Sequence, residues 1–303
     1  MKHTTFFSLF QKSNNTMNNV RIFLHSGLGN QLFQWSFGHY LFQSGINVQF
    51  VRVEKIHEQN HANFRLENLI STCAHGQFVT ISRFSISGLA LTARERNFPI
   101  SNTVLSDYSN QPNFVPSARR SRNLGVFGYF QTAEMIREVS KLINVELLNS
   151  LADKGPFTSQ VFANEEYSVI HFRRGDLKSS TNREKIGLLD RSYYFRCLEK
   201  ASGKLIVLTD DYADAEDFFV GDLTVDEILG PDDIDNVAGL YLMSFASKVF
   251  TANSTFSWWG AYLASIKKGE VFIPEPFFKG KEMPKTENYK FDGFQTLSAT
   301  FEV

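Results

Sequence analysis

Cysteine is scarce in this sequence, with two residues, Cys73 and Cys197, among 303. Two thiols cannot build a disulfide framework or a multi-thiolate metal site. We therefore expect the protein to work in a reducing compartment. We predict a cytoplasmic location and no bound metal.

Long hydrophobic runs are also lacking. The stretch MKHTTFFSLFQKSNNTMNNV has a basic start and one apolar patch, Phe6 to Phe10, which is far shorter than a signal-peptide core or a membrane span. We predict that residues 1–19 form a flexible extension. Met17 stands just before the first strand-like run, so it is a candidate for the true initiation site.

Neither sign of charge dominates. The 31 Lys and Arg residues against 32 Asp and Glu residues give a net charge of -1, which offers no protein-wide field for nucleic acid or anionic lipid. A composition of 43% hydrophobic and 21% charged residues is typical of a folded protein. We expect no nucleic-acid partner, and any anion site has to be local.

Strand-like runs alternate with helix-like runs along the chain. The run VRIFLHS (20–26) precedes a glycine loop and QLFQWSFGHYLFQSG, whose apolar residues recur at three- and four-residue steps. In the second half YSVIHFRRGD, GKLIVLTDD, SKVFTANSTFSWWG and GEVFIPEPFF each open on a β-branched run. This alternation predicts parallel sheets. The breakers Gly155 and Pro156 divide two predicted α/β domains, 20–155 and 156–303; residues 54–125 show no clear pattern.

The loop HSGLGNQ joins the first predicted strand to the first helix. Glycines between a strand and a helix let backbone approach a phosphate at the positive helix terminus. The Rossmann fingerprint is excluded because Leu32 stands where its third glycine is required, and no P-loop lysine follows. We predict that a ligand approaches at Gly27 and Gly29. The alternative is a turn without a ligand.

Two adjacent arginines end the predicted strand in VIHFRRGD. Two-residue alternation puts His171 and Arg173 on the same face. Guanidinium groups there need an anion or carboxylates, and their planar forks suit phosphate oxygens. The carboxyl end of a parallel strand is also where α/β sheets bind ligands. The alternative is an internal ion pair with Asp176.

Acidic residues follow another predicted strand, in VLTDDYAD. Asp210 and Asp211 are candidate ligands for a divalent ion, as in metal-dependent sugar transferases. They equally suit the start of the next helix, where carboxylates accept from free N–H groups. The stretch DDID, residues 232–235, contains an Asp-x-Asp that could bind a metal, but it lies in a loop-like stretch next to Pro231.

The segment FTANSTFSWWGAYLA (250–264) sets polar residues directly before three large aromatics. Asn253, Ser254, Thr255 and Ser257 are of types that cap a helix start or, with its free N–H groups, bind an anion. Such a helix start opposite Arg173 would hold a diphosphate from both sides. For Trp258 and Trp259 we favour a place in the core over stacking on a sugar.

Three segments, GLGNQLFQWSFG, HFRRGD and ANSTFSWWGAYL, together resemble the α-1,2-fucosyltransferases of glycosyltransferase family 11. Weaker agreement in GYFQ (128–131), LTDD and VFIPEPFF extends the likeness over most of residues 20–278. The sequence departs from the family at Ser26, where relatives often carry glycine, at Phe172 and at Leu177. The departures leave acceptor preference open.

The resemblance implies a GT-B-like fold of two Rossmann-like domains facing a cleft, the C-terminal one binding the donor GDP-β-L-fucose. It also implies inverting transfer to O2 of a galactose without a metal. The site residues that it implies are Arg173 with the leaving group, Asp176 or His25 as candidate base, His171 at the nucleoside and Arg174 on the donor or bracing the motif. Donor contacts are also expected from Gly27, Gly29, Asn30, Asn253, Ser254, Thr255 and Ser257.

Among these enzymes the chain looks like the bacterial type, which implies O-antigen assembly on a lipid-diphosphate-linked acceptor. A peripheral contact with the inner membrane follows as an expectation, with the basic SARRSR patch (117–122) as a candidate. A solvated loop is the alternative for that patch. Two other functions stay open: a nucleotide- or glycan-binding protein without transfer, and a metal-dependent sugar transferase.

Overall fold

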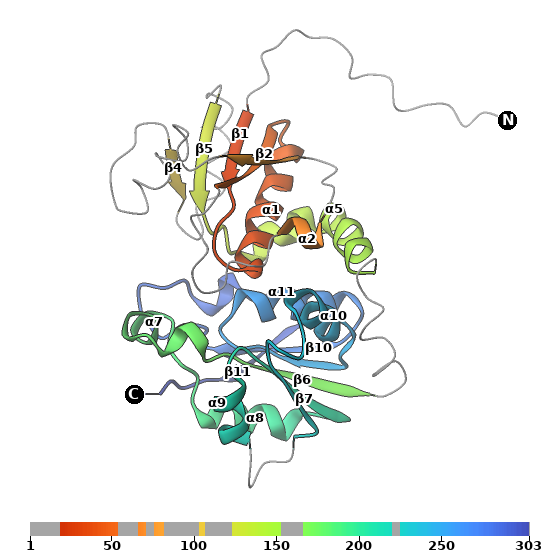
Figure 1. Cartoon of the computed structure of the whole chain (residues 1–303), viewed down its shortest axis with the longest axis vertical. Coiled ribbons are helices and arrows are strands. Elements are labelled where there is room, and N and C mark those ends of the chain that lie inside the picture. The colour runs from red at the N-terminus through yellow and green to blue at the C-terminus, as the bar shows by residue number, and fades with distance from the viewer. Residues whose placement is uncertain are drawn as a thin grey trace, which may run out of the picture.

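The computed structural model describes residues 19–53, 66–70, 76–81, 103–106, 123–152, 166–219 and 225–302. Residues 1–18 of the predicted extension with Met17, most of 54–125 with the SARRSR patch, and the predicted boundary near 155 lie outside the described residues. Two parallel sheets organise the described chain, one in each half (Figure 1). They confirm the predicted fold class, an α/β, GT-B-like protein with two Rossmann-like domains.

The N-terminal sheet has the strand order β3-β2-β1-β5-β4, and all its paired strands are parallel. From β1 the chain continues outward to β2 and β3. It then crosses to β4 at the other edge of the sheet and comes back to β5, which pairs with the other side of β1. Such a reversal opens a crevice at the carboxyl ends of the two central strands. The elements are β1 (Asn19–Phe23), α1 (Leu28–Gln43), β2 (Asn47–Val53), α2 (Leu66–Leu69), β3 (Gln77–Ile81), β4 (Thr103–Ser106), β5 (Asn123–Gly128) and α5 (Ala133–Ala152).

The C-terminal sheet has the order β11-β10-β9-β6-β7-β8, again parallel, which is the strand order of a doubly wound dinucleotide fold. Its reversal lies between β6 and β9. The elements are β6 (Tyr167–Phe172), η1 (Gly175–Lys178), α7 (Ser180–Lys185), α8 (Arg191–Lys200), β7 (Lys204–Thr209), α9 (Tyr212–Phe219), β8 (Glu227–Leu229), α10 (Asn236–Phe245), β9 (Lys248–Phe250), α11 (Thr255–Ile266), β10 (Glu270–Glu275), η2 (Thr286–Asn288) and β11 (Phe294–Ser298).

Helices cover both faces of the C-terminal sheet. Helices α10 and α11 lie between this sheet and the N-terminal domain, and α8 and α9 lie on the other face (Figure 1). Strand β6 is buried along its whole length, as a central parallel strand must be. Phe172 packs with Tyr194 and Phe219 on the α8–α9 face, whereas His171 contacts Phe256 of α11. The two-residue alternation predicted for this strand is therefore confirmed.

Most side chains of helices α1 and α11 are buried. They pack on each other: the ring of Phe33 lies 4.8 Å from Trp258 and 5.1 Å from Trp259, centroid to centroid. Both tryptophans are fully buried, which confirms their place in the core and excludes stacking on a sugar. One hydrophobic core thus runs from the N-terminal domain into the C-terminal domain.

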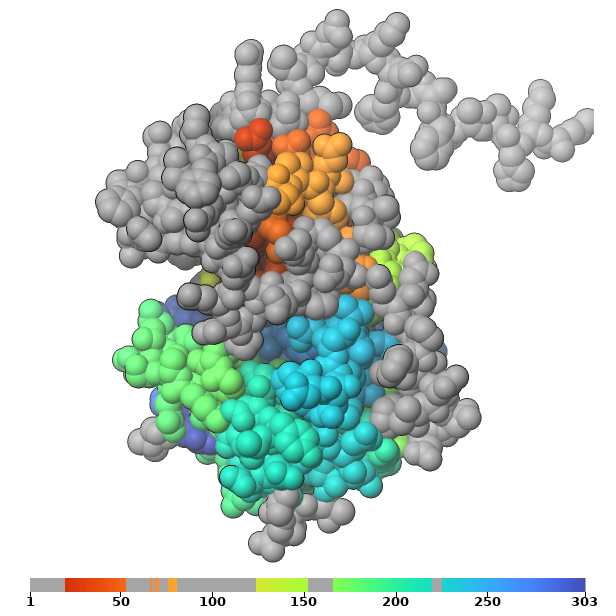
Figure 2. All heavy atoms as spheres, viewed as in Figure 1, coloured from red at the N-terminus to blue at the C-terminus, as the bar shows by residue number. Residues whose placement is uncertain are grey.

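The starts of α1 and α11 touch at Gly29. A Cβ atom there would overlap the backbone of Thr255 and Phe256, and the Gly29 carbonyl accepts a 3.0 Å hydrogen bond from Trp259 Nε1. Hydrogen bonds from Tyr289 to Gln131 and from Tyr262 to Asn144 are among those that also join the domains. In Figure 2 the coloured atoms of the N-terminal domain (red to yellow-green) lie directly above those of the C-terminal domain (green to blue).

Gly29→Ala should lower the free energy of unfolding by about 1–3 kcal/mol, because the added methyl group has to push two backbones apart. Gly27→Ala is the matched control, since a Cβ at Gly27 meets nothing within 4 Å, and its effect should stay within about 0.5 kcal/mol. Urea unfolding of both variants measures the difference. Equal stability of the two variants would contradict the close contact.

Candidate functional site

The candidate site lies at the carboxyl edge of the C-terminal sheet, where β6 and β9 pair. Arg173 follows β6, and Asn253 with the start of α11 follows β9. Arg173 Nη1 donates to the Asn253 backbone oxygen at 3.2 Å. The fold thus joins two predicted segments that lie 80 residues apart in the sequence.

Arg173 is held by Asp176 and stays partly open to solvent. Its Nη2 donates to both carboxylate oxygens, at 2.9 and 3.0 Å, so the ion pair proposed as an alternative is present. About 20% of the Arg173 side chain is exposed. Of its five N–H groups, at least one on Nη1 remains for a ligand. Asp176 orients the arginine with both of its oxygens, and Asn182 Nδ2 donates to the Asp176 backbone oxygen at 3.0 Å.

Arg174 lies on the opposite face of the sheet and is 3% exposed. Its guanidinium stands 4.4 Å above the Phe172 ring and pairs with Glu302 at 2.7 Å and Asp214 at 3.3 Å. These contacts turn the group away from Arg173 and into the α8–α9 side. They do not support the predicted donor contact of Arg174; they support its other predicted role, bracing the motif.

Asp210 holds the backbone of the arginine loop, residues 173–175, which follows β6. Its Oδ1 accepts from the backbone N–H groups of Arg174, at 2.7 Å, and Gly175, at 3.1 Å. A side chain at position 175 would press on this carboxylate, since a Cβ there would lie 2.7 Å from Asp210 Oδ2. The conformation of the arginine loop therefore depends on Asp210.

The neighbouring Asp211 caps α9 by accepting from the Asp214 N–H at 3.2 Å, as the capping interpretation predicted. A hydrogen bond from Lys178 holds the pKa of Asp211 below its ordinary value. In the DDID stretch, Asp235 caps α10 with two 2.8 Å hydrogen bonds. Within the described ranges, no three His, Cys, Asp or Glu side chains are grouped to hold a metal ion.

The polar residues at the start of α11 are buried and mostly engaged. Asn253 Nδ2 donates to the carbonyls of Ile186 and Gly187, at 3.0 and 2.8 Å. Ser254 precedes the helix without a side-chain cap bond, and the Ser257 hydroxyl donates to the Ser254 carbonyl at 3.3 Å. The predicted hydroxyls thus do not cap α11 through Ser254, which leaves the N–H groups of its first turn to other acceptors.

Three buried polar atoms at this edge make no hydrogen bond with any described residue: His171 Nδ1, Thr251 Oγ1 and Asn253 Oδ1. An unpaired buried polar atom costs about 1–3 kcal/mol. Their concentration at the ends of β6 and β9 marks a place suited to a polar ligand. Burial, with the charge of Arg173, lowers the pKa of His171 to about 3, so its imidazole is neutral at pH 7.

The predicted residues of the N-terminal loop have mixed roles. Gly27 has open space beside it, whereas the space beside Gly29 is filled by α11 backbone. Asn30 Oδ1 accepts from Gln131 Nε2 at 2.7 Å and from Thr255 Oγ1 at 3.0 Å. Gly29, Asn30 and Thr255 lie in the contact between the two domains, because α1 and α11 start side by side. Their donor contacts stay predictions.

Sequence reasoning missed two buried glutamines. Gln34 accepts from the His25 backbone N–H at 3.1 Å and donates to the Gly128 carbonyl at 3.1 Å, so it ties the β1 loop to β5. Gln131 links Asn30 to Tyr289.

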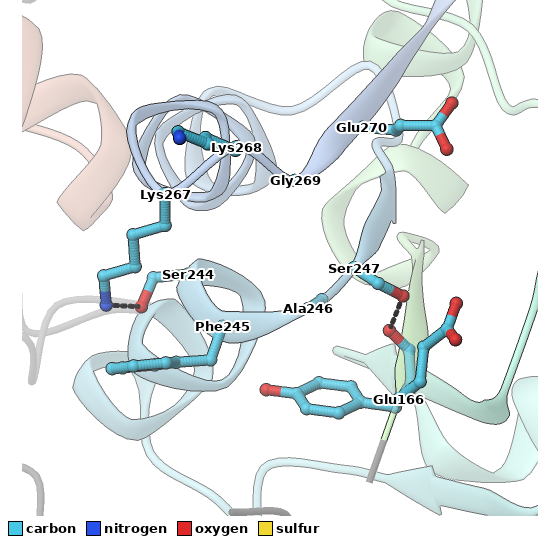
Figure 3. A pocket seen from close by; sticks show the side chains of 10 residues that line it. Glu166, Ser244, Phe245, Ala246, Ser247, Lys267, Lys268, Gly269 and Glu270 are labelled. Carbon is cyan, nitrogen blue, oxygen red and sulfur yellow. Dashed lines mark hydrogen bonds between the residues drawn. The ribbon is translucent and has the colours of Figure 1, made fainter. Parts of the chain in front are cut away.

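A separate cavity of about 420 Å³ opens at the other edge of the C-terminal sheet (Figure 3). It lies at the amino ends of β6 and β10, beside the ends of α10 and α11, and Lys267, Phe245 and Ser247 are among its lining residues. Lys267 donates to Ser244 Oγ at 3.2 Å, and burial lowers its pKa to about 8. This cavity is remote from Arg173 and belongs to no predicted motif.

Acid should destabilise the protein through His171. The unfolded imidazole binds a proton below about pH 6.5, whereas the folded one resists protonation down to about pH 3. Stability is therefore full above pH 6.5 and falls as the pH drops below it. Between pH 7.5 and 5.0 the loss from this group should be about 2 kcal/mol.

The measurement is urea unfolding of the wild type and His171→Gln at both pH values. The difference between the two proteins removes the contribution of the other histidines. An identical pH dependence in both would show that His171 takes up a proton as readily in the folded state as in the unfolded state, and would contradict the prediction.

No helix in the described part of the chain is long and apolar enough to cross a membrane. No known family model matches the sequence. The chain is 26% identical over 293 residues to the O-antigen biosynthesis glycosyltransferase WbnK of Escherichia coli, covering 86% of this chain and 96% of that protein. It is 24% identical to an alpha-1,2-colitosyltransferase of Escherichia coli, covering 86% and 92%. These full-length similarities support a glycosyltransferase.

Solved structures show only distant likeness. The Escherichia coli heptosyltransferase WaaC with ADP has a TM-score of 0.46 at 12% identity and covers 92% of this chain and 93% of its own. A variant of Arabidopsis thaliana FUT1 in complex with GDP has a TM-score of 0.42 at 10% identity, covering 84% and 70%. Scores this low say nothing about what the present chain binds.

Proposed function

We propose that this chain is an inverting α-1,2-fucosyltransferase. It transfers L-fucose from GDP-β-L-fucose to O2 of a terminal galactose in a surface polysaccharide precursor, an O-antigen unit carried on lipid diphosphate. The proposal rests on the three motif segments, on the two Escherichia coli relatives, of which one is named for O-antigen biosynthesis, and on the geometry of the arginine loop. One of those relatives is named for an α-1,2 transfer, the linkage proposed here.

The observation that carries the proposal is the place of Arg173 at the reversal point of the C-terminal sheet. The arginine and the start of α11 follow neighbouring strands, and the Arg173 side chain donates one hydrogen bond to the Asn253 backbone oxygen. A partly exposed guanidinium beside a helix N-terminus suits the two phosphates of a nucleoside diphosphate. The unpaired atoms of His171, Thr251 and Asn253 offer further polar contacts in the same place.

The proposed reaction is one in-line displacement. As the bond between the anomeric carbon and the diphosphate oxygen breaks, negative charge collects on the departing GDP. Arg173 and the α11 N-terminus stabilise that charge, and Asp176 keeps the guanidinium in position. His171 stays neutral at pH 7, so it contacts the donor by hydrogen bonding and adds no charge. The diphosphate needs no metal ion in this scheme.

Arg173→Ala should lower kcat for transfer by about 10²–10³, the typical loss when one preorganised donor to the developing charge is removed. The measurement is transfer from GDP-fucose to a panel of β-galactosides, with the product linkage read by NMR. Arg191→Ala is the matched control. It also removes an arginine, but one on α8 that bonds the Phe218 carbonyl and faces away from the site.

Wild-type transfer that Arg173→Ala loses and Arg191→Ala keeps would support the proposal. Equal activity in all three proteins would remove Arg173 from the reaction. GDP binding without any product would favour the binding-only alternative. Product that forms only with a colitose donor would contradict fucose as the transferred sugar, but it would not contradict the proposed role of Arg173.

Full activity in EDTA is expected, because Asp210 is committed to backbone N–H groups and Asp211 to Lys178 and the α9 cap. The measurement compares initial rates in EDTA with rates in added Mg²⁺ or Mn²⁺. A rate that collapses in EDTA and returns with metal would establish the metal-dependent alternative. Asp210→Asn under the same conditions would then test this carboxylate.

The two domains divide the work in this proposal. The C-terminal domain holds the donor, and the N-terminal domain presents the galactose. A peripheral membrane contact would bring the enzyme to a lipid-linked acceptor.

A further inference from the structure

His25 occupies in the N-terminal sheet the position that Arg173 occupies in the C-terminal sheet. It follows β1, and the ring reaches the end of β5, where Nε2 lies 3.2 Å from the Gly128 carbonyl. The ring stacks on Phe127 at 4.0 Å and meets the edge of Tyr129 at 4.8 Å. His25 therefore sits at the reversal point of its own sheet, where α/β sheets place ligands.

This loop borders the same domain junction as the arginine loop. It runs directly into α1, whose Gly29 and Asn30 touch the first residue of α11, Thr255. Helix α11, which starts beside Arg173, and helix α1, which follows His25, therefore start in contact with each other. Because each loop leaves its sheet beside this contact, both loops border the junction where the proposed transfer would bring donor and acceptor together.

Ser26 is strained in a way that points to a function. Its φ of 63° lies in the left-handed region, which costs a non-glycine residue about 1 kcal/mol or more. In this conformation Ser26 Oγ lies 3.1 Å from His25 Nδ1, and the Ser26 carbonyl accepts from Gln31 Nε2 at 2.8 Å. His25 is 3% exposed and Ser26 is partly exposed, so an incoming hydroxyl meets the serine first.

The hydrogen bonds define the proton positions. A carbonyl only accepts, so the Nε2 of a neutral His25 must carry the proton that faces Gly128. Nδ1 is then the basic nitrogen, and the Ser26 hydroxyl donates to it. Asp176, by contrast, spends both oxygens on Arg173, which makes it a poor proton acceptor.

We infer that the Ser26–His25 pair is the general base of the proposed transfer, with Ser26 relaying the proton. This assignment rests on the proposed function. The acceptor hydroxyl gives its proton to Ser26 Oγ as Ser26 gives its own to His25 Nδ1. The hydroxyl oxygen bonds to the anomeric carbon, and GDP leaves with the electron pair of the broken bond. The imidazolium keeps Nε2–H on Gly128 and later returns one proton to water.

The described contacts of the His25 ring include two aromatic side chains, Phe127 and Tyr129. Tyr129, next to β5, is the titratable side chain described in contact with the ring. From α1, the neutral amide of Gln34 accepts the His25 backbone N–H. An ascending limb in the rate between pH 5 and 8, where imidazoles titrate, is the expected signature.

The test measures single-turnover transfer to a galactoside that the wild type uses, between pH 5 and 8, together with GDP affinity by calorimetry. His25→Gln should lower the rate by about 10²–10⁴ and abolish the ascending limb, with GDP affinity unchanged. Ser26→Gly also removes the hydroxyl, but it relieves the strained backbone, so a loss of rate in this variant cannot be a folding defect.

A flat wild-type profile, or His25→Gln activity within threefold of wild type with the limb retained, would overturn the assignment. Ser26→Gly activity equal to wild type would overturn the relay. If His25→Gln does not fold, the wild-type profile and Ser26→Gly decide the question. Absence of transfer from the wild type on every galactoside would instead contradict the proposed function.

Discussion

The contact between the starts of α1 and α11 is the constraint on which the rest of the molecule depends. Gly29 allows the two helices to meet backbone to backbone, and Trp259 and Asn30 fasten them with hydrogen bonds. Both helices follow a strand at the reversal point of its sheet. Joining their starts therefore brings the two ligand-binding edges to one place. The shared core around Phe33 makes this junction apolar as well as specific, so the site geometry is built into the folded state.

Electrostatics in the arginine loop follows from the same sheet. The side chains of consecutive residues after β6 point to opposite faces of the sheet, so Arg173 and Arg174 have different surroundings. Arg174 is buried, and a buried charge has to be paired; Glu302 and Asp214 supply the partners. Arg173 stays at the edge with one carboxylate and spare donors. One arginine thus stabilises the loop, and the other is free to meet an anion.

Much of the fold could be predicted from the sequence because its signals are local. The two-residue alternation in β6, the all-round apolar character of α11 and the cap at Asp211 each depend on residues a few positions apart. The roles of Asn30 and Thr255 could not be predicted in this way. Their side chains form a hydrogen bond although they are 225 residues apart in the sequence, and no local sequence pattern predicts a partner at that separation.

The sequence by itself determined the α/β class, the segments that end at ligand-binding edges and the presence of two adjacent arginines at one of them. Only the tertiary structure decided which arginine lies open at the β6–β9 edge, which predicted residues contact each other across the two domains, and that His25 and Ser26 form a pair at the edge of the N-terminal sheet. The reason is that residue type and periodicity act over a few residues. Strand order and side-chain burial are properties of the whole folded chain, and they assign each polar group its partner.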